Sequence, residues 1–428
     1  MKYKITTLGC KVNQFETQAL EGLLAEQGLS PAGEGERADV VIVNTCAVTA
    51  ESGRKSRQAL RRMMGENPGA VSAVCGCFSQ LSPETVKELG ADVIHGSGEK
   101  RRFCEDIIKA LNQRETLVYT DDPFARREFE ELRGGAVDGR TRAVLKIQDG
   151  CVNFCSYCII PYTRGRLRSL PCDRCAELTR ELAEQGFREI VITGIEIASY
   201  GRDLTEKPGL ADAVESICSA AGDMRVRLGS LEPTVVTEDF CRRLADAGKV
   251  CGHFHLSLQS GCDEILSAMN RKYDTERFFR ATELLREYFP DCGMTADLIV
   301  GFPGETEAQH ESTLDFIRRC RFSSMHIFPY SPRPGTKAAE MANQIPGDVK
   351  SKRAAQAQAV AEAMEREYLQ SRIGRTEQVI FESVSDEMSS GHAPNYAHVC
   401  VRERQSRGLV RNVKITGLEE KMLVGYVV

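Results

Sequence analysis

Near the middle of the chain stands the sequence Cys151-Val152-Asn153-Phe154-Cys155-Ser156-Tyr157-Cys158, which carries three cysteines on one short segment. Cysteine thiolates are the usual ligands of iron–sulfur clusters, and a cluster with four irons normally takes four of them. Three thiolates therefore leave one iron open to another molecule. A zinc knuckle is the alternative, but zinc sites usually pair one C-x2-C unit with a second pair or with histidines. The spacing favours the cluster.

The residues around this segment predict that it is a loop at the end of a strand. The apolar run Ala143–Ile147 directly precedes it, and ligands gather outside the carboxyl ends of parallel strands. From Arg142 to about Ile345, strand and helix patterns alternate. Strands are predicted at 143–147, 189–193, 225–228, 253–258, 295–300 and 325–328. Six βα units that open with the cysteine loop predict an α/β domain built as a partial barrel.

Residues 1–112 also alternate between strand and helix patterns, which predicts a parallel sheet. Cys10, Cys46 and Cys77 stand just past the first three predicted strands. Because the carboxyl ends of neighbouring parallel strands lie side by side, we expect these thiols to converge at one edge of the sheet. Cys75 is an alternative to Cys77, and period-two alternation gives both the same facing. The competing interpretation is that these three cysteines follow the strands by chance and share no function.

Both cysteine triplets resemble those of a known family. The spacing of Cys151, Cys155 and Cys158 resembles the radical S-adenosylmethionine (SAM) superfamily, in which SAM binds the open iron of a 4Fe-4S cluster. The phrases at 9–17 (GCKVNQFET), 44–49 (NTCAVT) and 76–80 (GCFSQ) resemble the N-terminal domain of the methylthiotransferases. The resemblance implies an auxiliary 4Fe-4S cluster held by Cys10, Cys46 and Cys77, and hence two clusters and SAM as cofactors.

Further residues follow the ends of the predicted barrel strands. The superfamily resemblance makes five of these residues candidates to bind SAM. They are Thr193, Gly194, Ser257, Gln259 and Gly301. The alternative is that they form turns with a structural role only. The acidic residue that some relatives carry after the glycine is absent, because position 195 is Ile, and Glu196 is its possible substitute. Arg166, Arg168 and Arg333 are candidates to bind an anionic substrate, since arginine binds phosphate and carboxylate bidentately.

The sequence Lys11-Val12-Asn13-Gln14 resembles the branch of the family that acts on N6-threonylcarbamoyladenosine at position 37 of tRNA. The resemblance implies a transferase that places a methylthio group on carbon 2 of that base by radical chemistry. Methylthiolation of isopentenyladenosine at the same position, or of a ribosomal protein, is one alternative. A non-catalytic iron–sulfur protein that binds RNA is another.

Residues 371–428 change to period-two apolar runs, which predict a small antiparallel β-barrel. This segment resembles the TRAM domain, which implies RNA binding, and its basic residues bunch at Arg402, Arg404, Arg407, Arg411 and Lys414. The predicted organisation is an N-terminal domain at 1–112, a linker at 113–141, a radical-SAM partial barrel at 142–370 and the TRAM-like barrel at 371–428.

Composition limits where this protein works and what it binds. Among 428 residues, 56 Lys and Arg face 61 Asp and Glu, so any contact with tRNA has to come from local patches. Seventeen cysteines predict a reducing cytoplasm and free or metal-bound thiols. No apolar window of about 18 residues occurs, which predicts no membrane contact. The family resemblance also implies an electron donor such as flavodoxin or ferredoxin.

Overall fold

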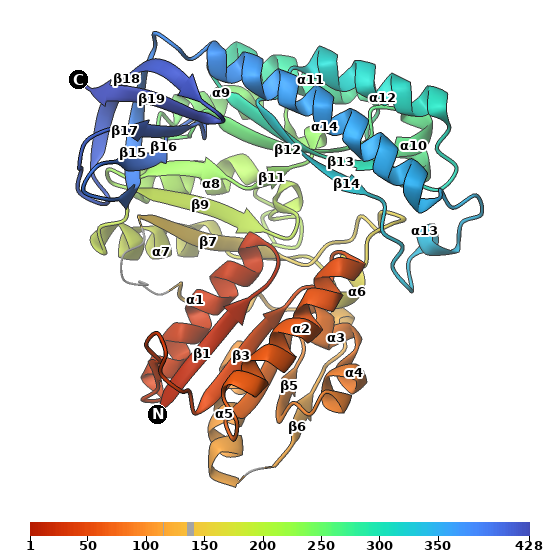
Figure 1. The fold of residues 1–428 in the computed structure, drawn as a ribbon, viewed down its shortest axis with the longest axis vertical. Coiled ribbons are helices and arrows are strands. Elements are labelled where there is room, and N and C mark those ends of the chain that lie inside the picture. The colour runs from red at the N-terminus through yellow and green to blue at the C-terminus, as the bar shows by residue number, and fades with distance from the viewer. Residues whose placement is uncertain (114, 135–140) are drawn as a thin grey trace.

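The computed structural model describes residues 1–113, 115–134 and 141–428. The N-terminal sheet domain, the central barrel and the small C-terminal barrel follow one another along the chain and pack together in space (Figure 1). The predicted α/β class with three such parts is confirmed. Of the predicted linker, residues 114 and 135–140 lie outside the described residues.

The N-terminal domain is a parallel sheet with helices on both faces. Its strands, in the order β2-β1-β3-β4-β5-β6, are β2 (Ser30–Pro31), β1 (Lys2–Thr7), β3 (Val40–Thr45), β4 (Val71–Gly76), β5 (Val93–His95) and β6 (Leu117–Tyr119). The apolar runs of β3 and β4 are buried along their whole length, as expected for parallel strands covered on both sides. Strand β6 and the short helix η1 (Pro123–Ala125) both fall within residues 113–141.

Two groups of helices cover this sheet. One apolar cluster joins α1 (Lys11–Glu26) and α5 (Lys100–Gln113) to one face. A second cluster joins the other face to the remaining helices, which are α2 (Ala50–Glu66), α3 (Cys77–Leu81) and α4 (Pro83–Glu88). Helices α1, α2 and α3 each begin at or near a predicted cysteine ligand, so the three cysteines lie at one edge of the sheet.

The central domain contains the six predicted parallel strands, divided between two four-stranded sheets. The first sheet holds β10 (Arg225–Leu228), β9 (Glu189–Gly194), β7 (Arg142–Asp149) and the short antiparallel β8 (Arg168–Ser169). The second holds β11 (Ser230–Leu231), β12 (His253–Gln259), β13 (Gly293–Val300) and β14 (Ser324–Pro329). Only Gly229 separates β10 from β11, so one bent segment contributes to both sheets and makes the wall of the partial barrel nearly continuous.

Helices cover the outer face of the barrel. They are α7 (Cys172–Glu184), α8 (Leu210–Ala220), α9 (Glu238–Asp246), α10 (Asp263–Ala268), α11 (Thr275–Tyr288) and α12 (Glu307–Cys320). Alternate strand residues such as Phe254, Leu256 and Leu258 join the core beneath these helices. The intervening side chains face the inside of the barrel, which is therefore polar in part. Helix α1 of the N-terminal domain packs against β7 and β9.

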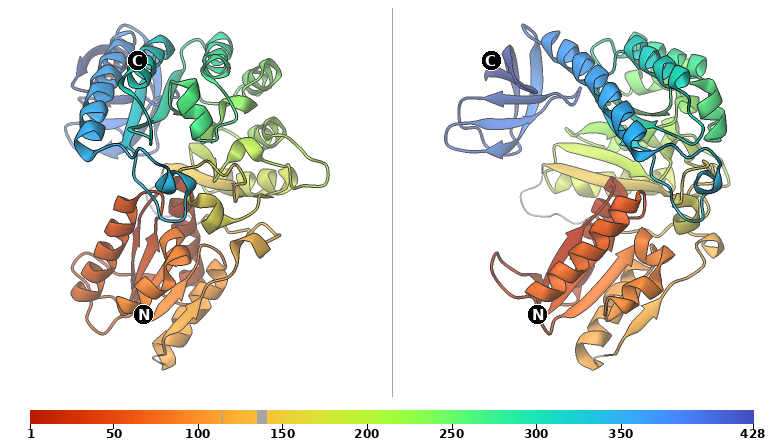
Figure 2. Two further views of the ribbon diagram at one scale, coloured as in Figure 1. Left: turned by 90° about the vertical axis from the view of Figure 1, so that its right-hand side faces the viewer. Right: turned by 45° about the vertical axis from the view of Figure 1, so that its right-hand side comes forward.

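Helix α14 (Gly347–Gln370) crosses the molecule and leads to the C-terminal domain (Figure 2). That domain is a closed barrel of β15 (Thr376–Val384), β16 (Ser389–His392), β17 (His398–Val401), β19 (Met422–Val427) and β18 (Val410–Glu419). The predicted barrel is confirmed, but the pairing of β17 with β19 is parallel. Five strands in a closed ring cannot alternate in direction all the way round, so one parallel pair is required.

The C-terminal barrel docks on the start of the central strands through arginines. Arg227 Nη1 donates to Pro394 O at 2.8 Å, and Arg225 Nη2 donates to His392 O at 2.8 Å. Glu189 accepts from both guanidiniums, at 2.7 Å from Arg227 Nε and 2.5 Å from Arg225 Nε. One buried carboxylate thus orients the two cations that hold the domain. Among the described residues, no helix has the length and apolarity needed to span a membrane.

Candidate functional site

The loop that carries Cys151, Cys155 and Cys158 follows β7 and is held by specific contacts. Gly150 has φ +77°, and a Cβ there would lie 1.8 Å from a backbone oxygen, so no other residue fits this turn. The amide of Cys151 donates to Gly165 O at 3.0 Å. Asn270, just past α10, donates to the carbonyl of Phe154 at 2.9 Å. The cysteines are therefore presented on a fixed loop at the carboxyl end of the barrel strands.

The environment of these three thiols fits a thiolate-bound cluster. Burial, and to a lesser degree the neighbouring thiol of Cys155, raises the pKa of Cys158 to about 12. Burial also raises the pKa of Cys151, and the other two thiols add to that shift. Arg271 Nη1 donates to the sulfur of Cys155 at 3.0 Å, and its guanidinium pairs with Glu232 at 2.5 Å. Burial and mutual repulsion keep the thiols of Cys151 and Cys158 neutral on their own, so a bound metal has to displace their protons, and Arg271 beside Cys155 offsets part of the resulting negative charge.

Cys10, Cys46 and Cys77 converge as predicted from the order of the strands. A Cβ added to Gly9 would lie 2.8 Å from the sulfur of Cys46, so the first two loops touch. Burial, with added repulsion from Cys77 and Cys46, raises the pKa of Cys10 to about 11. As whole residues, Cys46 and Cys77 are buried and Cys10 is exposed, so the burial at Cys10 concerns its sulfur alone. The three thiols thus form a second triplet with one side open.

Cys75 does not share the facing of Cys77, and that expectation is wrong. Strand β4 ends at Gly76, and Cys77 is already the first residue of α3, so the alternation of a strand does not extend to it. Cys75 instead packs in the apolar cluster with α1 and α5 on the other side of the sheet. Burial raises the pKa of the Cys75 thiol to about 12, as expected for a packing residue.

The two triplets face each other across the boundary between the domains. The thiol of Cys77 makes a small contribution to the raised pKa of Cys158. Arg164 lies between the domains at the end of α6 (Ile160–Arg164), and its Nε donates to the Cys77 sulfur at 3.3 Å. Helices α3 and α6 pack against each other. A ligand bound at one triplet is therefore close to the other.

Among the described residues, no group of His, Cys, Asp and Glu side chains has the arrangement that holds a single metal ion.

The candidate SAM-binding residues lie where they were predicted, at the carboxyl ends of β9, β12 and β13; they are Thr193, Gly194, Ser257, Gln259 and Gly301. The amide of Gly301 is already bonded to Glu305 at 2.6 Å. Glu196 comes close to Cys151, and burial followed by repulsion from Glu232 raises the pKa of its carboxyl. These residues share one edge of the barrel with the Cys151 loop.

The three arginines predicted to bind substrate lie in different environments. Arg166 is exposed and donates to Phe124 O at 3.3 Å. Arg168 is buried, donates to two backbone carbonyls and lies 3.7 Å from Asp149, so its guanidinium is occupied inside the protein. Arg333 has a buried Nε with no hydrogen-bond partner among the described residues, and it interacts electrostatically with Cys46. Of the three, Arg333 has the most capacity left beside the site.

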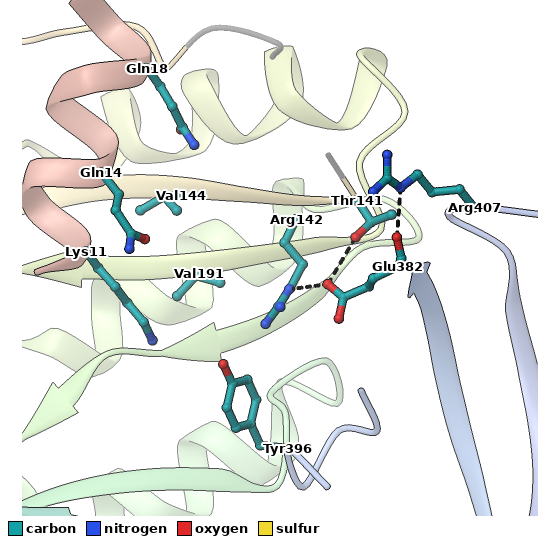
Figure 3. Close-up of a pocket in the computed structure, with 10 residues that line it drawn as sticks. All are labelled: Lys11, Gln14, Gln18, Thr141, Arg142, Val144, Val191, Glu382, Tyr396 and Arg407. Atoms are coloured by element: carbon teal, nitrogen blue, oxygen red, sulfur yellow. Dashed lines mark hydrogen bonds and ion pairs between the residues drawn. The ribbon is translucent and has the colours of Figure 1, made fainter. Parts of the chain in front are cut away.

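A cavity of about 310 Å³ lies where all three domains meet (Figure 3). Helix α1 contributes Lys11, Gln14 and Gln18 to its lining, and the barrel strands contribute Val144 and Val191 from the inside of the barrel. The remaining lining residues are Thr141, Arg142, Glu382, Tyr396 and Arg407. Burial, followed by repulsion from Arg227 and Arg142, lowers the pKa of Lys11, which indicates an electropositive cavity.

Several residues of the site carry no motif that sequence reasoning detects. Gln148 donates to Gly150 O at 2.7 Å and accepts from the amide of Glu196 at 2.8 Å, so it joins the cysteine loop to the next strand end. Burial alone would raise the pKa of Asp149, but Lys146 and the nearby arginines hold it well below its usual range. The only available signal is that polar residues end the otherwise apolar strand β7.

Comparisons with known proteins agree with this geometry. The sequence matches the Radical SAM superfamily over residues 145–317 and the family described as "Uncharacterized protein family UPF0004" over residues 2–96. The radical S-adenosylmethionine methyltransferase TsrM from Kitasatospora setae, solved with cobalamin and a [4Fe-4S] cluster, has a TM-score of 0.59 at 15% identity. The match covers 79% of this chain and 74% of that one. This likeness concerns the fold alone.

Two similar curated proteins share one name. "Threonylcarbamoyladenosine tRNA methylthiotransferase MtaB" of Bacillus subtilis is 35% identical over 416 residues, 96% of this chain and 92% of that protein. Its namesake in Thermotoga maritima is 36% identical, over 98% and 96%. The "tRNA-2-methylthio-N(6)-dimethylallyladenosine synthase" of Acetivibrio thermocellus is 34% identical, over 90% and 81%.

The barrel and the cysteine loop at its carboxyl end define a radical SAM protein, a class that uses SAM and a 4Fe-4S cluster. Within this class, the chain belongs to the methylthiotransferase family, in the branch of the threonylcarbamoyladenosine tRNA methylthiotransferases.

Proposed function

We propose that this protein inserts a methylthio group at carbon 2 of N6-threonylcarbamoyladenosine at position 37 of tRNA. The observation that carries this proposal is the position of the two cysteine triplets at one domain boundary, where α3 packs against α6 and Arg164 donates to the sulfur of Cys77. The reaction has to open a C–H bond and deliver sulfur to the same carbon. Two sites on either side of one substrate meet that requirement. The radical source and the sulfur source are then both held beside the same carbon, and neither has to diffuse to it.

Cys151, Cys155 and Cys158 hold the cluster to which SAM binds, and Cys10, Cys46 and Cys77 hold a second 4Fe-4S cluster. When bound, these groups supply the radical that opens an unactivated C–H bond, the sulfur atom and the methyl group. The protein holds the two cysteine triplets in fixed positions relative to one another. Arg271 donates to a sulfur of the first triplet and Arg164 to a sulfur of the second, so each site has one cation that stabilises negative charge on its ligands.

Around these triplets, the strand-end set Thr193, Gly194, Ser257, Gln259 and Gly301 binds SAM. Arg333 faces the substrate from the loop after β14, and that loop reaches the N-terminal domain, where the amide of Ala50 donates to Ser331 Oγ at 3.3 Å. Exposed Arg166 suits a phosphate at the mouth of the site. Arg168 takes part by fixing the backbone of that loop, since its guanidinium binds the carbonyls of Arg164 and Arg166.

The tRNA also binds to the C-terminal barrel. Arg411 and Lys414 on β18 donate only to backbone carbonyls, which leaves their charge available to phosphates. Arg402 and Arg404 are exposed but already pair with Glu419 and Asp386. The electron donor is a small reducing protein such as flavodoxin or ferredoxin, and the protein works in the cytoplasm.

Mass spectrometry of tRNA nucleosides from cells with and without the gene tests the proposal. We expect 2-methylthio-N6-threonylcarbamoyladenosine to disappear with the gene. The relatives named dimethylallyladenosine synthases, at 34 to 35% identity, make the dimethylallyl nucleoside the second candidate substrate. Loss of its methylthio form instead would keep the chemistry and change the substrate. An unchanged set of tRNA nucleosides would refute both and favour a ribosomal protein as substrate or a non-catalytic RNA-binding role.

A further inference from the structure

We propose that the cavity where the three domains meet binds the threonylcarbamoyl arm of the substrate nucleoside, and that Lys11 is the cation for the carboxylate of that arm. This inference rests on the proposed function and adds the residues that select the substrate. None of the three arginines expected from the sequence is in this cavity, whose cations are Lys11, Arg142 and Arg407.

The cavity has the size and position that such an arm requires. Its volume of about 310 Å³ is at the lower end of the range of small-molecule sites, which suits a short polar chain better than a whole nucleotide. Lys11 directly follows Cys10, so its Cα lies about 3.8 Å along the backbone from that of a predicted cluster ligand. The cavity therefore adjoins the N-terminal triplet on one side and extends toward Arg142 at the start of β7, away from the Cys151 loop at the end of that strand.

Three polar side chains of α1 face the cavity without partners. Lys11, Gln14 and Gln18 are spaced three and four residues apart, which places them on one face of the helix (Figure 3). Within the described residues, none of these three side chains makes a hydrogen bond or an ion pair. Gln18 is only 4% exposed, and its amide lies at the wall of the cavity. A polar ligand in the cavity would satisfy that amide.

The charges around the cavity favour an anion. Glu382 is the only carboxylate among the lining residues, and it is already bound by Arg142 at 2.6 Å and by Thr141 Oγ1 at 3.2 Å. Arg407 Nε donates to the backbone carbonyl of Glu382 at 2.8 Å, which leaves its charge without a carboxylate (Figure 3). Lys11 has no acidic partner within hydrogen-bonding distance among the described residues. The cavity therefore holds more positive charge than its own acid balances.

This lining also predicts which substituent is rejected. The threonylcarbamoyl arm offers a carboxylate, a hydroxyl and amide groups, which match the ammonium of Lys11 and the amides of Gln14 and Gln18. An apolar dimethylallyl arm would cover the exposed Lys11 and Gln14 and the buried Gln18 without giving any of them a polar partner. Sites built for hydrogen bonding reject a substrate that lacks the matching groups far more strongly than apolar pockets reject a misfit. Lys11 and Gln18 are therefore specificity-determining residues.

The test compares two anticodon stem-loop RNAs that differ only at position 37, which is N6-threonylcarbamoyladenosine in one and adenosine in the other. Binding to the reconstituted holoenzyme is followed by fluorescence anisotropy at one fixed salt concentration. The variants are Lys11→Met and Gln18→Leu. Lys87→Met, on exposed α4, is the matched control. Iron content and unfolding temperature are compared first, because Lys11 adjoins Cys10 and a damaged site would mimic lost binding.

We expect Lys11→Met to weaken binding of the modified loop about 10- to 100-fold, the loss of one charged hydrogen bond, and to leave the adenosine loop unchanged. Gln18→Leu should act in the same direction more weakly, and Lys87→Met should change neither loop. Equal weakening of both loops by Lys11→Met would overturn the proposal in favour of a phosphate contact. The proposal would also be overturned if Lys11→Met bound both loops with the same affinity as the wild type.

SAM carries a carboxylate too, so equilibrium dialysis with SAM distinguishes the two sources. A SAM affinity lowered by Lys11→Met, with the preference between the loops intact, would assign the cavity to SAM and refute the proposal. If the wild-type protein itself does not prefer the modified loop, the proposed substrate fails. If the wild type prefers it and Lys11→Met retains the full preference, only the assignment of the cavity fails.

Discussion

The Nε atom of Arg164 donates to the sulfur of Cys77 at 3.3 Å, although the two residues belong to different domains. The same guanidinium is fully buried and binds the carboxylate of Glu16. Its Nη1 lies 3.5 Å from the carboxylate of Asp149. Because α6 follows the Cys151–Cys158 loop, this one side chain links the loop of the first triplet to a ligand of the second. The position of one site therefore depends on the other.

Replacing Arg164 by Met should destabilise the protein and shift one cluster. The change leaves Glu16 and Asp149 buried with fewer cations, and removing one partner of a buried pair costs about 3–5 kcal/mol. It also removes a hydrogen bond to the Cys77 sulfur, and such bonds help to set cluster potentials. We expect a lower midpoint potential for the N-terminal cluster in a redox titration followed by electron paramagnetic resonance, and a lower free energy of unfolding in urea.

Arg166→Met is the matched control for stability and potential. Arg166 is two residues away and exposed, and its Nε donates to the backbone carbonyl of Phe124. Its loss should change the free energy of unfolding by about 0.5 kcal/mol or less. Equal effects of the two substitutions would refute the particular role of Arg164.

Arg271 has the corresponding position at the first triplet and gives a second prediction. Its Nη1 donates to the Cys155 sulfur at 3.0 Å, and Glu232 pairs with the guanidinium. Arg271→Gln should lower the midpoint potential of the SAM-binding cluster, because a positive charge beside its ligand is lost. Glu232→Gln should raise it, because the carboxylate that offsets the Arg271 charge is removed. Potentials that move in the same direction in both variants would contradict this electrostatic account.

Much of the fold followed from the sequence because apolar periodicity and cysteine spacing are local signals. Strands β9, β10 and β12 lie within one residue of their predicted bounds, and the order of the strands predicted that Cys10, Cys46 and Cys77 converge. The parallel pair in the C-terminal barrel was not predicted, because it results from closing a ring of five strands rather than from any segment.

The charged residues of the site were harder to predict, because their partners are distant in sequence. The basic loop Arg164–Arg168 suggested a phosphate site, yet Arg164 is fully buried against Glu16, which lies 148 positions earlier. Nothing near Glu16 distinguishes it from an exposed helix residue. Lys11 was recognised only as part of a family motif, and its cavity arises from the meeting of three domains. Long-range packing of this kind leaves no periodic pattern.

The contrast between Cys75 and Cys77 gives a third prediction, on iron content. Cys77→Ala removes a ligand of the N-terminal triplet and should lower the iron bound per chain by about half, since one of two equal clusters is lost. Cys75→Ala should retain all of the iron, because Cys75 packs on the other side of the sheet. Iron and acid-labile sulfide are measured after anaerobic reconstitution. Loss of iron in Cys75→Ala at an unchanged unfolding temperature would instead make Cys75 the ligand.

The last prediction concerns Glu189, which binds Arg225 and Arg227 and so orients the side chains that hold the C-terminal barrel. Burial alone would raise its pKa, but the arginines lower it to about 2, compared with about 4.3 for an unperturbed glutamate. A depressed carboxyl pKa stabilises the fold above the unfolded value and loses that effect as the pH falls through the folded value. The contribution, about 3 kcal/mol from this difference, is therefore complete at neutral pH and declines from about pH 4.3 to pH 2.

Glu189→Gln should consequently unfold more easily than the wild type at pH 7, and the difference should narrow below pH 4. Urea unfolding on protein stripped of iron measures this without interference from acid-labile clusters. Limited proteolysis at pH 7 should also release the C-terminal barrel sooner, since Arg225 and Arg227 lose the carboxylate that aims them at His392 and Pro394. Glu181→Gln, in an exposed pair with Arg133, is the control and should change stability by less than about 1 kcal/mol. A constant difference from pH 7 to pH 2 would show that Glu189 acts through packing, because only its charge is lost over that interval.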